Sequence, residues 1–66
     1  MTQYKKIIGE GRFTAEITYD PDFNEFAVVH FDGGKKMDAP IYYTNKKKRA
    51  KQLAKSAIQE LENRNG

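Results

Sequence analysis

The sequence predicts a small α+β domain, in which a three-stranded antiparallel β-meander packs against one C-terminal α-helix. Three observations predict this class. Apolar and polar residues alternate with a period of two through the first two thirds of the 66-residue chain, turn-forming residues separate these stretches, and the period then changes to 3.6. One domain covering residues 1–66 is expected, because a chain of this length has material for one small core.

The first eleven residues are compatible with two arrangements. Residues 4–8 form a short fourth strand that turns at Gly9-Glu10-Gly11, or they begin a long first strand that bends at the same glycines. We favour the short strand, and the alternative stays open at this point.

Residues 12–19 predict the first main strand. Apolar side chains occupy every second position, which gives the strand one buried and one exposed face. The apolar face comprises Phe13, Ala15, Ile17 and Tyr19. Residues 20–24, Asp-Pro-Asp-Phe-Asn, have the composition of a turn and end this strand.

Residues 25–31 predict the central strand, because they are rich in β-forming residues and apolar in both phases. Either phase can therefore face away from the helix. The two sets are Phe26, Val28 and His30, or Ala27, Val29 and Phe31. Residues 32–35, Asp-Gly-Gly-Lys, then predict a tight hairpin, because glycine adopts positive φ at little cost.

Residues 36–43 predict the third strand. The alternation returns, and the face expected to be buried comprises Met37, Ala39, Ile41 and Tyr43. Pro40 lies in the other phase and has no N–H to donate to a neighbouring strand. We therefore expect this strand at an edge of the sheet.

Residues 45–62 predict the helix. An unbroken apolar stripe at helical spacing comprises Ala50, Leu53, Ala54, Ala57, Ile58 and Leu61. Thr44 or Asn45 is expected to cap its start. Its charges oppose the helix dipole, because cations crowd the first turns and Glu60 and Glu62 stand near the end. Packing against the sheet must therefore hold this helix in place.

Composition narrows the classes of function. The chain is 38% hydrophobic, has no Cys, one His and a net charge of +3, which is typical of a folded domain without disulfides or a zinc site. It shows no signal-peptide segment and no membrane-spanning apolar run, so we expect a cytoplasmic protein without membrane association. It has no cofactor motif and no nucleophile–base pair, so we expect no enzymatic activity, no cofactor and no metal at His30.

The most informative feature is a run of cations without an acid in residues 46–55. It comprises Lys46, Lys47, Lys48, Arg49, Lys51 and Lys55. These residues contribute +6, so the rest of the chain carries −3. Each cation at a helix start costs up to ~1 kcal/mol, unless an anion lies in front of the helix. The run is compatible with a solvated lysine face that keeps a small protein soluble, but we favour phosphate contacts and a nucleic-acid partner, with duplex preferred and DNA or RNA undecided.

The motif Lys47-Lys48-Arg49-Ala50-Lys51 resembles the Lys-Lys-x-Ala-Lys start of the last helix in double-stranded-RNA-binding domains. A three-stranded antiparallel sheet precedes the helix in that family also, and the resemblance covers residues 12–62. It implies that Lys47, Lys48 and Lys51 contact phosphates across the RNA major groove. Residues 1–11 are too short for the family's first helix, so its minor-groove contacts are not carried over.

The predicted architecture is also similar to that of arm-site DNA-binding domains of tyrosine recombinases, which read DNA with the open face of a sheet. This resemblance implies contacts from the sheet face. The candidates are Arg12, Lys36, Phe26 and Tyr42. Of these, the two aromatic rings are suited to stacking on bases. An accessory protein of a phage or other mobile element would suit this architecture.

A function of a different class stays open. The chain is also compatible with a small protein-interaction or homodimerisation module that docks an acidic partner through the helix or the open sheet face. One helix covers one face of a sheet, and the central strand is apolar in both phases, so an apolar patch is expected on the other face. A second copy of the chain, or residues 3–8 folded across it, would cover this patch.

Overall fold

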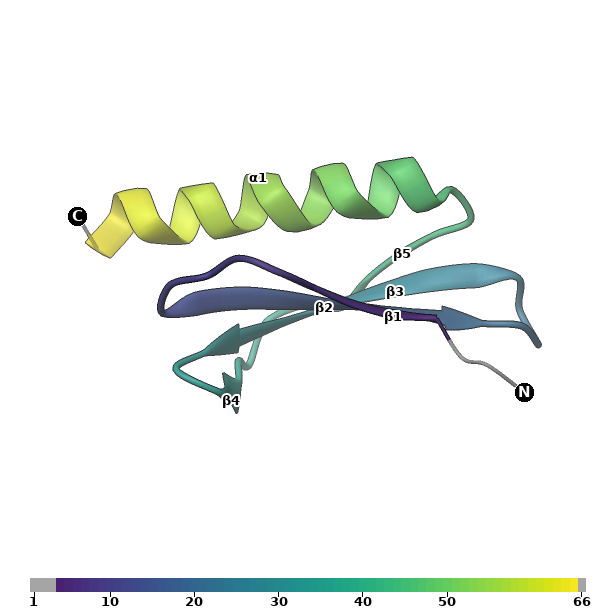
Figure 1. Ribbon diagram of the computed structural model, residues 1–66, viewed down its shortest axis with the longest axis horizontal. Helices are drawn as coiled ribbons and strands as arrows, with labels where there is room; N and C mark the ends of the chain where they lie inside the picture. The colour runs from purple at the N-terminus through teal and green to yellow at the C-terminus, as the bar shows by residue number, and fades with distance from the viewer. Residues whose placement is uncertain (1–3, 66) are drawn as a thin grey trace.

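A computed structural model describes residues 4–65 and shows one antiparallel sheet with a helix across one of its faces (Figure 1). The elements are β1 (Lys5–Ile8), β2 (Phe13–Asp20), β3 (Glu25–Asp32), β4 (Lys35–Lys36), β5 (Tyr42–Thr44) and α1 (Lys47–Asn65). The predicted α+β class is confirmed. No helix within residues 4–65 is long and apolar enough to cross a membrane.

The N-terminal segment forms the short separate strand β1. It pairs with β2 in the register Lys6↔Ile17 and Ile8↔Ala15, and so extends the sheet at one edge. The turn after it depends on Gly9, which has a φ of +99°. A Cβ at this position would lie 2.8 Å from the carbonyl oxygen of Phe13, so a larger residue would be strained here.

Strands β2 and β3 form the central hairpin, paired from Phe13↔Asp32 to Asp20↔Glu25. The turn between them is closed locally. The Tyr19 hydroxyl donates to Asn24 Oδ1 over 2.5 Å, and Asn24 adopts a φ of +52°, a conformation that asparagine tolerates better than most residues. Residues opposite one another on β2 and β3 share a face of the sheet, which defines the two faces.

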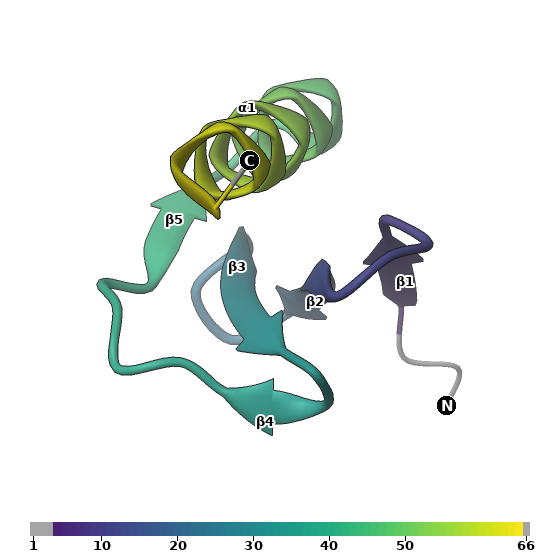
Figure 2. The same cartoon turned by 90° about the vertical axis from the view of Figure 1, so that its left-hand side faces the viewer.

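The prediction of one continuous third strand over residues 36–43 is wrong. This stretch is divided into β4 and β5, which both pair with β3 on the edge away from β1, and residues 37–41 between them leave the ladder after Met37 (Figure 2). Pro40 lies in this segment and has no N–H to donate. Six steps separate Lys36 from Tyr42, but only three separate their partners Phe31 and Val28. Three residues are therefore extra.

This odd number of extra residues reverses the phase of β5. Tyr42 pairs with Val28 and so lies on the face that α1 covers, whereas Tyr43 pairs with Ala27 on the other face and is 62% exposed. The prediction of Tyr43 as a core residue is wrong for this reason. The prediction of Tyr42 on the open face is wrong for the same reason.

The core lies between β2, β3 and α1. Its buried apolar residues are Phe13, Ala15, Ile17, Val28, Ala50, Ala54 and Ile58. On β3, Val28 and His30 face the helix, which leaves Ala27, Val29 and Phe31 on the uncovered face. Phe26 shares the phase of Val28 and packs against the core. Its prediction as an open-face contact is therefore also wrong.

Helix α1 begins two residues later than predicted and ends three residues later. Thr44 Oγ1 accepts the N–H of Lys46 over 3.3 Å, and the Lys46 carbonyl then accepts the N–H of Ala50 over 3.0 Å. Thr44 therefore closes the turn that leads into the helix. Near the other end, Arg64 forms an ion pair with Glu60 one turn earlier, over 2.7 Å.

Candidate nucleic-acid interface

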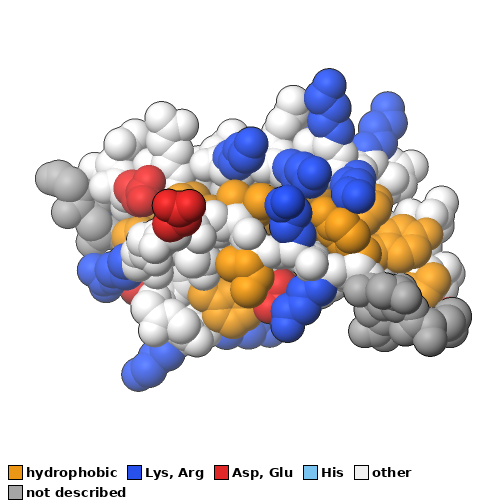
Figure 3. All heavy atoms as spheres, in the orientation of Figure 1, with side chains coloured by type: hydrophobic (Ala, Val, Ile, Leu, Met, Phe, Trp, Pro, Cys, Tyr) orange, Lys and Arg blue, Asp and Glu red, His pale blue; other side chains and the backbone are white. Residues whose placement is uncertain are grey.

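The predicted cations gather at the start of α1. Five of them lie in its first nine residues, and Lys46 directly precedes it. All are exposed except Lys51, which is half-buried. Figure 3 shows Lys and Arg side chains crowded over the N-terminal half of the helix, with acidic side chains towards its other end. The structure thus brings the predicted basic residues together on one part of the surface.

Within residues 4–65, none of these six cations forms an ion pair with an acidic residue. The ion pairs found there are Lys5–Glu16 at 3.6 Å, Arg12–Asp32 at 2.6 Å and Arg64–Glu60 at 2.7 Å. The three acids that form these ion pairs therefore bind cations outside the basic run, and the positive charge at the helix start is available to a ligand.

The backbone adds to this positive charge. Within the described part of the chain, no acceptor outside the helix takes the N–H groups of Lys47, Lys48 and Arg49. These groups point out of the helix start, where the dipole is equivalent to roughly +0.5 of an elementary charge. Such a helix start can bind a phosphate oxygen through its N–H groups while lysines contact the same or neighbouring phosphates.

Helical spacing sorts the cations into sides. Lys47, Lys51 and Lys55 are four residues apart and lie along one flank. This flank faces β1, because the Lys47 ammonium lies 4.4 Å from the centroid of the Tyr4 ring, just before that strand. Arg49 belongs to the opposite flank. Lys48 precedes Lys51 by three residues and so lies beside this flank. We call the set of four the basic ridge, which is the set that the helical spacing predicts to reach one phosphate backbone: Lys47, Lys48, Lys51 and Lys55.

Two residues near this ridge escaped the sequence prediction. Tyr4 supplies the ring beneath Lys47. Lys6 pairs with Ile17, so it adds an exposed cation on the side of β1 that faces the helix. Lys6 and Ile8 are two residues apart, so they lie on the same face of a strand. This spacing predicts that Lys6 lies on the helix side only when the short strand and its register are known.

The four predicted sheet-face residues are not brought together. Arg12 is held by Asp32, which its guanidinium contacts over 2.6 and 3.1 Å and whose carboxylate raises the pKa of Arg12. Phe26 packs its ring against Tyr4 and Tyr19, with centroids 5.7 and 4.9 Å away. Neither ring predicted to stack on bases lies on the uncovered face.

Tyr42 lies beside His30, with ring centroids 5.7 Å apart. Lys36, in contrast, lies on the uncovered face opposite Phe31. That face also carries Glu16, Asp20 and Glu25, which would repel phosphates. The helix start is therefore the better candidate for binding a polyanion.

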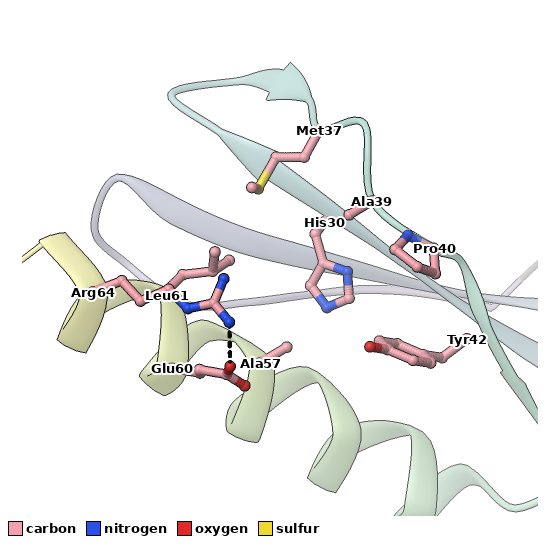
Figure 4. A pocket seen from close by; sticks show the side chains of 9 residues that line it. All are labelled: His30, Met37, Ala39, Pro40, Tyr42, Ala57, Glu60, Leu61 and Arg64. Carbon is pink, nitrogen blue, oxygen red and sulfur yellow. Dashed lines mark hydrogen bonds and ion pairs between the residues drawn. The ribbon is translucent and has the colours of Figure 1, made fainter.

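A second feature is a hollow of about 190 Å³ between the C-terminal half of α1 and residues 37–42 (Figure 4). His30 lies at its base and is only 5% exposed. Its Nε2 has no hydrogen-bond partner within residues 4–65. Burial lowers the pKa of His30, because a charged imidazolium loses its hydration there. The Glu60–Arg64 ion pair stands at the rim (Figure 4).

Comparisons with protein-family models, with curated proteins and with solved structures found no match for this chain. The resemblance of the Lys47–Lys51 motif to double-stranded-RNA-binding domains therefore stays a prediction.

Proposed function

We propose that the protein binds nucleic acid without catalysing a reaction, through phosphate contacts from the first turns of α1. One observation carries this proposal. Lys46, Lys47, Lys48 and Arg49 stand at the start of the helix, where they oppose the dipole, Lys51 and Lys55 follow in the next turns, and none of the six has an acidic partner in residues 4–65. A phosphate backbone in front of the helix would turn this unfavourable arrangement into a favourable one.

The geometry supports a division of roles. Lys47, Lys51 and Lys55 follow one flank over about 12 Å, since eight residues of helix rise by that length. A series of cations over this distance suits successive phosphates better than a single small anion. Lys48 and the N–H groups of the first turn would approach from the helix start. Contacts of this kind give affinity and orientation but carry no base preference.

An electrophoretic mobility assay tests the proposal. Duplex DNA, duplex RNA and single strands of equal length are compared at low salt with the wild-type chain and a Lys48→Glu/Lys51→Glu variant. The matched control is Lys35→Glu/Arg64→Glu, which changes the net charge equally at β4 and at the far end of α1. We expect the helix variant to lose binding and the control to keep it. Equal loss in both variants would show a net-charge effect and would contradict a site on α1.

The same cations would also serve a module that docks an acidic protein. Competition with polyglutamate separates the two functions in the same assay. Phosphate contacts at regular spacing predict that duplex competes far better than polyglutamate of the same charge. Stronger competition by polyglutamate would place the acidic-protein function first.

A further inference from the structure

The face of the sheet opposite α1 has no cover within residues 4–65 (Figure 2). Its apolar side chains include Ile7 and Tyr43, which are 59% and 62% exposed, and the half-buried Ala27, Val29 and Phe31 of β3. β1 extends the sheet at its edge and does not fold across this face. A monomer of this size rarely leaves such a surface to water.

The charges on this face are arranged in two poles. In the middle, Lys5 and Glu16 neutralise each other over 3.6 Å. At one end, Lys36 stands opposite Phe31. At the other end, Asp20 and Glu25 lie side by side as a strand pair. Since Phe31 and Glu25 are six positions apart in β3, the basic and acidic poles lie roughly 20 Å apart along the strands.

This arrangement is complementary to itself. A two-fold axis in the plane of the interface, perpendicular to the strands and passing between Ala27 and Val29, places the Lys36 end of each copy on the acidic end of the other. The apolar middle of one copy then meets the apolar middle of the second. Asp20 and Glu25 would repel a polyanion or a uniformly acidic protein at this face. A second copy of the chain therefore suits the face better.

We propose that the protein forms a two-fold symmetric dimer through this uncovered face, with Lys36 of each copy paired with the acidic pole of the other. β2 and β3 extend about 26 Å along the strands, but β1, β4 and β5 are only four, two and three residues long, so the strands of each copy cover roughly 400 Å². The pair would bury roughly 800 Å², an area typical of weak association, and a weak dimer is expected.

Both α1 helices would lie on the outer surfaces of this dimer, so the inference does not depend on the nucleic-acid function. Sedimentation equilibrium across micromolar concentrations tests it without any nucleic acid present. We expect the wild-type chain to dimerise and Lys36→Glu to weaken the dimer roughly tenfold or more, because two attractive contacts become repulsive. The matched control Lys55→Glu changes the charge equally on α1 and should leave dimerisation unchanged.

The reciprocal variant separates the charge pairing from other effects. Glu25→Lys should weaken the dimer as Lys36→Glu does, and the double variant Lys36→Glu/Glu25→Lys should restore it. Circular dichroism checks that each variant is folded. A wild-type monomer at all concentrations, a dimer indifferent to Lys36→Glu, or a double variant that stays dissociated would each overturn the proposal.

Discussion

The ammonium group of Lys47 lies 4.4 Å from the centroid of the Tyr4 ring, so the first turn of α1 contacts the residue that precedes β1. A cation over an aromatic face is stabilised by about 0.5–1 kcal/mol at an exposed site. This contact offsets part of the cost of placing Lys47 against the helix dipole. No such contact is found for Lys48 in the described residues, so the two neighbouring lysines should respond differently to substitution.

We predict that Lys48→Glu stabilises the domain by a few tenths of a kcal/mol up to about 1 kcal/mol, because an acid at the helix start interacts favourably with the dipole. Lys47→Glu should stabilise it less, or not at all, because the contact with Tyr4 is lost. Urea denaturation of the two variants measures the difference in the free energy of unfolding. A large destabilisation by Lys48→Glu would show that the basic run is structural.

Salt dependence measures the number of phosphate contacts. If Lys47, Lys48, Lys51 and Lys55 each neutralise one phosphate of duplex DNA, log affinity should fall against log salt with a slope of about −3.6. Lys48→Ala should make this slope shallower by about 0.9. Lys35→Ala in β4 is the control and should leave it unchanged. Affinity that is insensitive to salt would rule out the phosphate model.

The core predicts unequal costs along the apolar stripe of α1. Ile58 is buried at 7% exposure, whereas Leu53 is only half-buried on the flank of the helix. Ile58→Ala should therefore cost about 2–5 kcal/mol, a large part of the stability of so small a domain. Leu53→Ala should cost clearly less. Thermal unfolding followed by circular dichroism ranks the stabilities of the two variants. Equal losses of stability would contradict the deeper burial of Ile58.

Stability should depend on pH through His30, the only histidine of the chain. Its folded-state pKa is lowered from 6.5 by burial, so below about pH 6.5 the unfolded chain binds a proton that the folded chain does not. Stability is therefore complete above this pH and declines as the pH falls towards the lowered value. We expect this decline in urea midpoints to begin as the pH falls below about 6.5, above the ordinary pKa values of carboxylates.

The variant His30→Leu isolates this effect, since it removes the titrating group and keeps an apolar side chain under α1. The decline that begins near pH 6.5 should disappear in the variant. Glu60, Arg64 and the Tyr42 hydroxyl are the other ionisable groups lining the same hollow. A decline of equal size in the variant would assign the pH dependence to groups other than His30.

The elements with a strong hydrophobic periodicity were predicted well from the sequence. The alternation in residues 12–19 and 25–31 corresponds to β2 and β3 within one residue, and Ala50, Ala54, Ile58 and Leu61 of the predicted stripe lie on the packed side of α1. These elements depend on local patterns that one face of a core imposes on the chain. The third strand failed because three extra residues around Pro40 reverse its phase, and alternation alone cannot reveal where a strand leaves the ladder.

The sequence by itself determined the fold class and the concentration of positive charge at the start of the helix, because hydrophobic period and residue charge are properties of neighbouring residues. Only the tertiary structure decided which ring lies under Lys47, which of Tyr42 and Tyr43 lies on the helix side of the sheet, and that Glu16, Asp32 and Glu60 pair with cations outside the basic run. Each of these depends on strand register, where a shift of one residue moves a side chain to the opposite face.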